Sequence, residues 1–402
     1  MKKISLFMLV SFFLSPVFTS FAQDKEKKTD SGYVFTMQKQ LPETSVKNQN
    51  RSSTCWSYSA VSFLETELLR MGKDTFNLSE MFSVRHAYSD KALMYIRFNG
   101  KHNFGPGGAA HDVTNVLKKY GMVPEEVYTG MTIGEQNPVH GEMDAVFHAY
   151  IDAVLKNPNR KLSPVWQQGF NGMLDAYLGK LPEKFNYKGT EYTPRSFADM
   201  LGLNPDDYVE LTSYTHHPYY SKFIIEIPDN WAMDEVYNLP LDEMIQVIDN
   251  AVNEGYTVVW GADVSEKGFS WKTGVAVVPD KNASEITGSD RDKWTKMSDA
   301  EKEKLLFKFD RPNPEKKITP EMRQVEFDNY QTTDDHGMHL TGIAKDQNGT
   351  KYYLIKNSWG TEGSPYKGHF YASESYVRLK TMDIMVHKNA IPKEIRKKLG
   401  IN

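Results

Sequence analysis

Apolar residues recur with the period of a helix directly after Cys55, which is the only cysteine in the 402-residue chain. Successive apolar positions are three, four and three residues apart, which is typical of a helix with one buried face. They are Val61, Leu64, Leu68 and Met71. Gly72 is a typical helix stop, so the pattern predicts a buried helix that begins near Cys55.

The residues before this helix are Ser52, Ser53 and Thr54, all of which are good N-cap residues. They place the Cys55 thiol in the first helical turn, where unpaired backbone N–H groups and the helix dipole favour a thiolate. The sequence therefore makes Cys55 a candidate nucleophile. The alternative is a structural cysteine that packs as a small hydrophobic side chain.

Further periodic segments divide the chain into a helix-rich first half and a strand-rich second half. Helical spacing predicts a helix after Ser79, which would cap it, and further helices at 109–120, 145–155, 169–178 and 241–253. Short β-type runs predict strands at 223–227, 257–264, 275–278, 340–345, 352–356 and 370–372. The pattern indicates an α+β fold.

Composition limits the class of protein and of partner. Hydrophobic residues make up 40% and charged residues 25%, which is ordinary for a soluble globular chain. The net charge of −4 argues against a polyanionic partner. The basic cluster formed by Lys393 and Arg396–Lys398 is too small to carry nucleic-acid binding alone. We therefore expect no nucleic-acid partner.

The N-terminus has the pattern of a secretory signal peptide. A basic start, Met1–Lys3, precedes an apolar run over Ile4–Phe21, and Ala22 is a small residue before a polar segment. We expect cleavage after Ala22 and export to the periplasm or the cell exterior. The alternative, a retained membrane anchor, is disfavoured by Pro16 and by the shortness of the apolar run. Residues 23–44 are expected to form a linker and an extended segment.

The segment around Cys55 carries the first part of a candidate catalytic site. Gln49 precedes Cys55 by six residues, and Trp56 follows it. A cysteine nucleophile needs a base that takes its proton, and an imidazole titrates in the right range. A histidine and a residue that orients it are therefore expected far downstream in the chain.

Two downstream segments supply those residues. His336 lies in Asp335–Gly342, where small and apolar residues follow the imidazole, and Asn357 begins the segment Asn357–Gly360. Together with the segment around Cys55, these motifs resemble the active-site segments of papain-like cysteine peptidases. Local similarities narrow the resemblance to the bleomycin hydrolase and bacterial aminopeptidase C branch. They lie at Gly107–Gly108, Lys119–Pro124, Val259–Asp263 and His336–Met338, with Ser52 where papains generally have a disulfide cysteine.

The resemblance implies a papain-like, two-lobed α+β fold for residues 45–402. A helical lobe would carry Cys55, and a β-barrel-like lobe would carry His336 and Asn357. A large, mostly helical insert is expected at about 129–238. The cleft between the lobes is where the site is expected.

The resemblance also implies a role for each site residue. Cys55 would be the nucleophile, His336 the base, and Asn357 the group that orients the imidazole. Gln49 would donate to the oxyanion together with the backbone N–H of Cys55. The expected substrate-binding residues are Gly107, Gly108, Trp56 and Trp359. Peptides are the expected substrates, and no cofactor is expected.

Aminopeptidase action is the leading expectation. The family forms hexamers, so the resemblance also implies a homo-oligomer. In bleomycin hydrolases, the C-terminal residues lie in the cleft and meet the amino group of the substrate. Here the segment after Pro392 looks shortened. An endopeptidase or a dipeptidyl-releasing peptidase with an open cleft is therefore an alternative. An inactive peptide-binding receptor is another.

Other histidines offer competing interpretations. His339 is a rival base, but residues three apart in a strand point to opposite faces, and the neighbouring glycines favour His336. A metal site built from these two histidines and Asp334–Asp335 matches no strong metal motif. His216 and His217 have no carboxylate or further histidine at ligand spacing, so no metal site is expected there.

Overall fold

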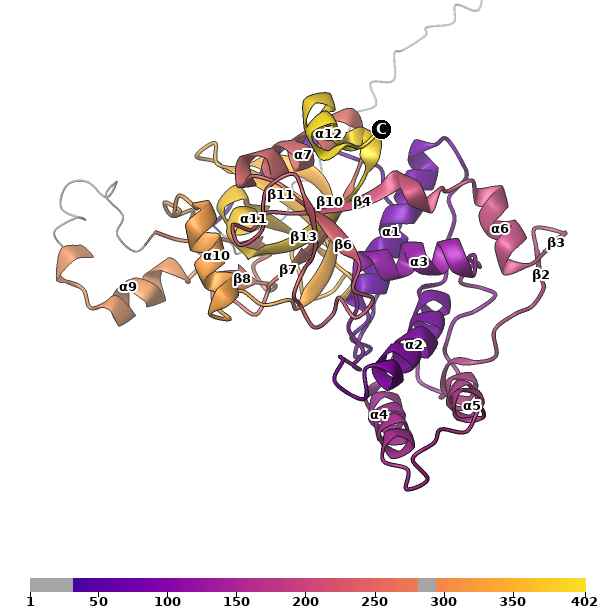
Figure 1. Cartoon of the computed structure of the whole chain (residues 1–402). Coiled ribbons are helices and arrows are strands. Elements are labelled where there is room, and N and C mark those ends of the chain that lie inside the picture. Colours follow the sequence, from indigo (N-terminus) through magenta and orange to yellow (C-terminus); the bar gives the residue numbers. More distant parts are fainter. Residues whose placement is uncertain (1–31, 281–293) are drawn as a thin grey trace, which may run out of the picture.

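The computed structural model describes residues 32–280 and 294–402, and Figure 1 shows that they form two lobes. Helices α1 to α6 lie on one side, and a large twisted sheet with its own helices lies on the other. This is the α+β arrangement that the sequence predicts. The predicted signal peptide, residues 1–22, lies outside the described residues. Among the described residues, no helix is both long enough and apolar enough to cross a membrane.

Helix α1, Cys55–Arg70, is the buried helix that the hydrophobic period predicts. Its fully buried residues include Val61, Leu64 and Leu68. The expectation for Met71 is wrong, because this residue lies just past the helix and is 41% exposed. Thr54 is the N-cap residue, but its hydroxyl contacts Ser52 Oγ at 2.6 Å instead of capping a helical N–H.

The other helices of this lobe include those predicted at 109–120, 145–155 and 169–178. They are α2 (Glu80–Arg97), α3 (Ala110–Lys119), α4 (Gly141–Leu155), α5 (Trp166–Leu178) and α6 (Pro194–Leu201). Ser79 caps α2 as predicted, since its hydroxyl accepts from the Phe82 N–H at 3.0 Å. The apolar faces of these helices share one core with α1.

In the described part of the chain, eleven strands form the main sheet, in the order β5-β6-β4-β13-β7-β10-β11-β12-β9-β8, and β1 pairs with β10. Strand β10 is antiparallel to its neighbours β7 and β11, so it lies inside the sheet and is held on both edges. The strands are β1 (Thr36–Gln40), β4 (Tyr208–Thr212), β5 (Lys222–Ile224), β6 (Glu235–Asn238), β7 (Val258–Ala262), β8 (Phe269–Ser270), β9 (Val275–Ala276), β10 (His336–Lys345), β11 (Lys351–Lys356), β12 (His369–Ser373) and β13 (Thr381–His387).

The insert predicted at 129–238 contains α4, α5 and α6 but also strands that the periodicity did not reveal. The hairpin of β2 (Phe185–Tyr187) and β3 (Thr190–Tyr192) stands apart from the main sheet. Strand β4 pairs antiparallel with β13, and β6 pairs parallel with β4. These pairings join the insert directly to the β lobe.

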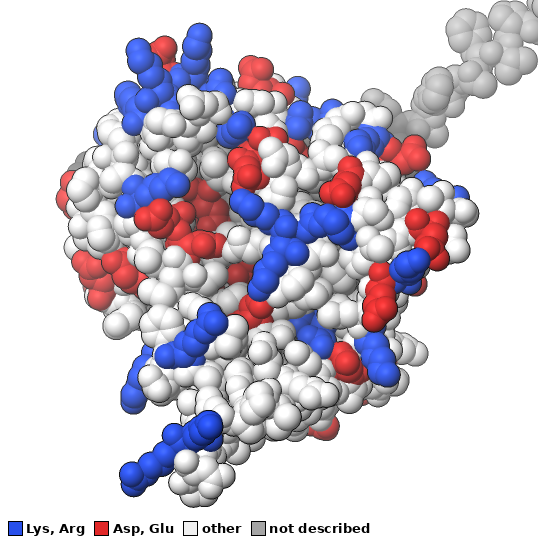
Figure 2. Space-filling model, turned by 45° about the vertical axis from the view of Figure 1, so that its right-hand side comes forward, with Lys and Arg blue, Asp and Glu red and all other residues white. Residues whose placement is uncertain are grey.

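Most of the remaining helices lie around the sheet, while α9 stands out from it in Figure 1. The remaining helices are α7 (Leu241–Glu254), α9 (Asp299–Leu306), α10 (Pro320–Asp328), α11 (Glu374–Lys380) and α12 (Lys393–Leu399), with short 3-10 turns η1 (Pro205–Asp207) and η2 (Lys388–Ala390). Helix α12 lies close to α7, where Lys398 Nζ contacts Glu243 Oε1 at 2.6 Å. Figure 2 shows acidic and basic side chains interspersed, with basic ones gathered at the top, the end where α12 lies in Figure 1.

A buried cluster of charges holds the segment that precedes α1. Lys47 Nζ lies 2.5 Å from Glu80 Oε1 and 3.3 Å from Glu65 Oε1, and both carboxylates are almost fully buried. From β11, Lys356 Nζ donates to the carbonyl oxygen of Thr44 at 2.7 Å. These contacts hold residues 44–47 against α1, α2 and β11, and so position Gln49 and the start of α1.

We expect Lys47→Met to lower the free energy of unfolding by about 3–5 kcal/mol, because it leaves two buried carboxylates without their cation. Urea unfolding followed by circular dichroism measures this difference. Lys118→Met is a matched control, since the Lys118–Asp206 ion pair is exposed on both sides and should contribute little. Equal effects of the two substitutions would contradict the role given to Lys47.

Candidate active site

The lobes meet where β10 lies directly against the first turns of α1. Gly337, the second residue of β10, makes this possible because it has no side chain. A Cβ atom at this position would lie 2.9 Å from Ser59 Oγ and 3.2 Å from the Cα atom of Trp56. The close approach sets His336, at the start of β10, and Cys55, at the start of α1, beside the same surface hollow.

His336 is held by the residues that follow β11. Its Nε2 atom lies 2.7 Å from Asn357 Oδ1, and the same oxygen accepts from the Ser358 N–H at 2.7 Å. Because that oxygen is an acceptor, Nε2 carries the hydrogen and Nδ1 is the basic nitrogen. The indole of Trp359 stacks on the imidazole, with ring centroids 4.8 Å apart, and excludes water from this contact.

Gln49 is oriented by contacts with the same segment. Its backbone N–H donates to the Ser358 carbonyl at 2.7 Å, and its side-chain Oε1 accepts from Ser358 Oγ at 2.6 Å. Because Ser358 holds the amide oxygen of Gln49, the amide nitrogen remains available as a donor. Gln49 lines the hollow beside Cys55, so this nitrogen can donate to a group bound there.

The hollow brings together most of the predicted site residues. Its lining includes Gln49, Cys55, Gly107, His336 and Trp359. It therefore joins three segments that lie far apart in the sequence, as the motifs predict. Asn357 lies just behind this surface, in contact with His336.

Two predicted substrate-binding residues do not line the hollow. Trp56 is buried, and its Nε1 donates to the Pro106 carbonyl at 3.0 Å. A Cβ atom at Gly108 would lie 3.0 Å from the Trp56 ring, so Gly108 packs against the indole. A role for Trp56 and Gly108 in substrate binding therefore stays a prediction. These residues support the loop that presents Gly107, and the loop's contact with the indole explains why a glycine is needed there.

Sequence reasoning missed Asp229, which lies in the insert and lines the hollow beside Gly107. Its carboxylate oxygens lie 2.1 and 2.3 Å from where a Cβ atom of Gly107 would be. The neighbouring backbone is docked on the loop, because Asn103 Nδ2 donates to the Pro228 carbonyl at 2.9 Å. Trp231 Nε1 also donates to Asp112 Oδ2, at 2.8 Å. No local signal links residues about 120 positions apart, so only the folded structure reveals this contact.

His339 lies away from the hollow, as strand alternation predicts. Its Nδ1 atom is 2.9 Å from Ser62 Oγ, and its ring meets Phe63 edge-on. Asp335 is held by the loop after β7, where its carboxylate accepts from Ser265 Oγ at 2.6 Å. The metal site weighed for His336, His339 and the two aspartates is therefore not assembled.

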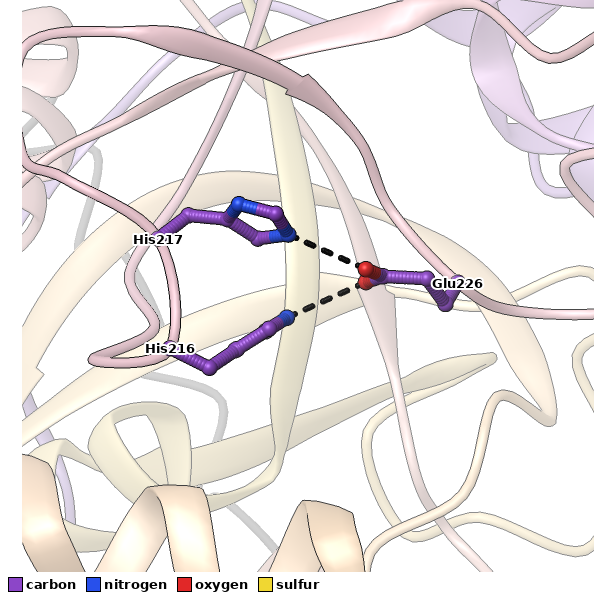
Figure 3. A group of neighbouring side chains, drawn as sticks. All are labelled: His216, His217 and Glu226. Carbon is purple, nitrogen blue, oxygen red and sulfur yellow. Dashed lines mark hydrogen bonds and ion pairs between the residues drawn. The ribbon is translucent and has the colours of Figure 1, made fainter.

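His216 and His217 differ from expectation. Figure 3 shows both imidazoles pointing at the carboxylate of Glu226, with Nε2–Oε distances of 3.1 and 3.0 Å. The premise that no carboxylate lies near them is wrong. The chain returns through β5, and Glu226, which follows β5, lies beside the two histidines. Among the described residues, this is the one cluster of three His, Cys, Asp or Glu side chains with ligand atoms close enough to share a metal ion.

Comparisons with known proteins agree with this geometry. A model of the Peptidase C1-like family matches residues 317–401, which include His336 and Asn357. Aminopeptidase C of Streptococcus thermophilus is 23% identical over 92% of this chain and 86% of its own length. Aminopeptidase G of Lactobacillus delbrueckii subsp. lactis is 23% identical over 88% of this chain and 83% of its own. The crystal structure of PepW from Lactobacillus rhamnosis has a TM-score of 0.69 at 19% identity, covering 92% of this chain and 85% of that one.

The chain is similar to the Peptidase C1-like family over residues 317–401. It is a cysteine-type peptidase of the papain-like aminopeptidase C and bleomycin hydrolase branch. The likeness to PepW supports the papain-like two-lobed fold over most of both chains. The relatives also span the segment at 129–238, since the matched regions cover nearly the whole chain.

The pKa of the Cys55 thiol differs from the expectation that its position at a helix N-terminus favours a thiolate. Burial, together with the charges of Asp229 and Asp334, raises the pKa of the Cys55 thiol to about 12, although the Gly337 N–H opposes this. Burial also lowers the pKa of His336, against the effect of its bond to Asn357. Both shifts favour a neutral thiol and a neutral imidazole. The helix N-terminus alone therefore does not hold Cys55 as a thiolate in this peptidase.

We expect Gly337→Ala to lower kcat/KM on a fluorogenic peptide by about 10-fold or more. The added methyl group must push β10 away from α1, and small misplacements of reacting groups are costly to rate. Gly172→Ala in α5 is the matched control, because nothing lies within 4 Å of its added Cβ. Unchanged kcat/KM in a folded Gly337→Ala variant would show that the close approach is not needed.

Proposed function

We propose that this peptidase removes residues from the amino end of peptides, and that Cys55, His336 and Asn357 are its catalytic triad. The observation that carries the triad is the shared hollow, in which the Cys55 thiol and the His336 imidazole line one surface while Asn357 holds the imidazole from behind. The names of the relatives, aminopeptidases C and G, support action at the amino end.

The reaction follows from the orientation of each group. His336 Nδ1 takes the proton of Cys55 as the sulfur attacks the carbonyl carbon of the scissile peptide. The resulting oxyanion accepts from the Gln49 amide nitrogen and the Cys55 N–H. His336 then gives its proton to the leaving amine, and a water molecule hydrolyses the thioester with His336 again as base. Asn357 keeps the imidazole in the tautomer that this sequence requires.

Recognition of a free amino group is supported by the charge of the hollow. Among the described residues that line it, Asp229 and Asp335 are the acidic ones and none is Lys or Arg. The Asp335 carboxylate already accepts a hydrogen bond from Ser265 in the loop after β7. The Asp229 carboxylate accepts one long hydrogen bond, from Asn103 Nδ2 at 3.3 Å. Asp229 is therefore the carboxylate with acceptor capacity to spare, and an ammonium group bound there would lie on the Gly107 side of the thiol.

The C-terminal residues of the chain contribute nothing to this hollow. Ile401 packs against the core of the β lobe, and Lys398 is paired with Glu243 on α7. Among the described residues, the carboxylates that line the hollow are the groups available to bind the amino end of a substrate. The expected export signal, the periplasmic or extracellular location and the homo-oligomer remain predictions, and the proposal does not depend on them.

The test compares two fluorogenic peptides that differ only in a free or blocked amino terminus. We expect turnover of the free form, at least about 100-fold slower turnover of the blocked form, and loss of both in Cys55→Ala. Turnover of the blocked peptide at a similar rate would favour an endopeptidase. Binding of either peptide without Cys55-dependent turnover would favour a peptide receptor.

We expect Asp229→Asn to raise KM for the free-amino peptide by about 10-fold or more, the cost of losing a charge-assisted hydrogen bond, with a smaller change in kcat. Burial raises the pKa of Asp229, although Lys91 opposes this. Protonation as the pH falls removes the charge, so KM of the unaltered peptidase should rise as the pH is lowered, and at a higher pH than for an ordinary aspartate.

Asp229→Asn should flatten this pH dependence. Asp234→Asn is the matched control, since Asp234 lies five residues on, bonds to Asn115 and does not line the hollow. A KM that is unchanged in Asp229→Asn, with its pH dependence intact, would assign amino-group recognition to another residue.

A further inference from the structure

The cluster of His216, His217 and Glu226 lies outside the catalytic hollow, in the turn between β4 and β6. The two histidines follow β4, and Glu226 follows β5, so a short excursion of the chain brings all three together. Figure 3 shows the imidazole nitrogens converging on the two carboxylate oxygens. The three ligand atoms all lie within 4.8 Å of one another. All three side chains remain partly open to solvent.

A neighbouring amide fixes the tautomer of His216. Gln324 Oε1, on α10, accepts from the Thr215 N–H at 2.7 Å, while Gln324 Nε2 donates to Asp328 Oδ1 at 2.8 Å. The orientation of the Gln324 amide is therefore set, and its oxygen faces His216 Nδ1 at 3.1 Å. Since that oxygen can only accept, His216 Nδ1 must carry the hydrogen.

The consequence lies at the other nitrogen of the same ring. With the hydrogen on Nδ1, the neutral imidazole of His216 has a lone pair on Nε2, and this lone pair faces Glu226 Oε2 at 3.1 Å. Two acceptors face each other, and they repel unless a cation lies between them. That cation is either a second proton on the ring or a metal ion. Metal-binding histidines typically donate their other N–H to an oxygen in this way, which fixes the ring for the ion.

Aromatic side chains hold both rings in place without any metal. His217 stacks on Phe223, with ring centroids 4.2 Å apart, and His216 stacks on Phe327 at 5.8 Å. The rings thus lose little conformational freedom when they bind a ligand. In a tetrahedral zinc site, ligand atoms lie about 3.4 Å apart, given metal–ligand distances of about 2.1 Å. His216 Nε2 lies 3.1 Å from Glu226 Oε2, and His217 Nε2 lies 3.0 Å from the other oxygen, Oε1, so each imidazole is within a few tenths of an ångström of this distance from the carboxylate. The three ligand atoms lie within 4.8 Å of one another, so small side-chain shifts would complete the site.

We propose that His216, His217 and Glu226 bind one divalent transition-metal ion, with zinc as the best fit. Two imidazole nitrogens and one carboxylate are ligands that zinc accepts readily, and solvent would fill the fourth position. The ion would link the turn after β4 to the segment after β5, and through Gln324 to helix α10. The site is separate from the catalytic hollow and shares no lining residue with it.

The test titrates ZnCl₂ into the chelator-treated full chain, without a histidine tag, in a Cys55→Ala background that removes the only thiol. Isothermal titration calorimetry should give one ion per chain. We expect at least about 10-fold weaker binding in Glu226→Gln and loss of binding in His217→Ala. Glu235→Gln is the matched control, because Glu235 is an exposed carboxylate on the neighbouring strand β6 and should bind zinc as the background does.

A second measurement keeps the result clear if a variant folds poorly. Cobalt(II) added to the Cys55→Ala chain should give the visible absorption of a four-coordinate nitrogen and oxygen site, and zinc should displace it. No saturable binding in the Cys55→Ala background would overturn the proposal. Equal binding in the background, Glu226→Gln and His217→Ala would overturn it as well. Either result would assign the cluster to protonated histidines paired with Glu226.

Discussion

The contact of β10 with α1 at Gly337 is the constraint on which the active site depends. The nucleophile belongs to a helix of one lobe and the base to a strand of the other, and no disulfide can join them because Cys55 is the only cysteine. Their alignment therefore rests on packing, with Gly337 as the point of closest approach. The buried charges around Lys47 act on the same contact, since they fix the segment that leads into α1.

The insert belongs to the site as much as the two lobes do. Strand β4 pairs with β13, so the insert is held to the β lobe by a hydrogen-bonded ladder. At its other end, Trp231 bonds to Asp112 on α3 and the Pro228 carbonyl accepts from Asn103, so this end is held to the helical lobe. Asp229 lies between these attachments. Its position at the hollow is therefore fixed by both lobes, which suits a group that must meet a substrate at a defined distance from the thiol.

Features governed by local sequence could be predicted, and features governed by distant contacts could not. The period of α1, the cap at Ser79 and the opposite faces of His336 and His339 depend on neighbours in the chain. Motif resemblance predicted that Gln49 lies near Cys55 and that Asn357 contacts His336, and the structure places them so. It did not predict that Trp56 lies behind the hollow, because a tryptophan beside a cysteine can support a cleft from behind as well as line it. Glu226 and Asp229 carry no local signal, since β5 and the docked segment after it determine what they meet.

The electrostatics of the hollow connect substrate recognition to activation of the thiol. Burial is the main cause of the raised pKa of Cys55, and the negative charge of Asp229 adds to it by opposing formation of the thiolate. In the proposed function, an ammonium group bound at Asp229 would cancel that charge. The pKa of the thiol would then fall, and transfer of its proton to the neutral imidazole of His336 would become easier. A substrate without a free amino group would leave the opposing charge in place. The same carboxylate can thus select the substrate and hold the nucleophile in its neutral form until that substrate is bound.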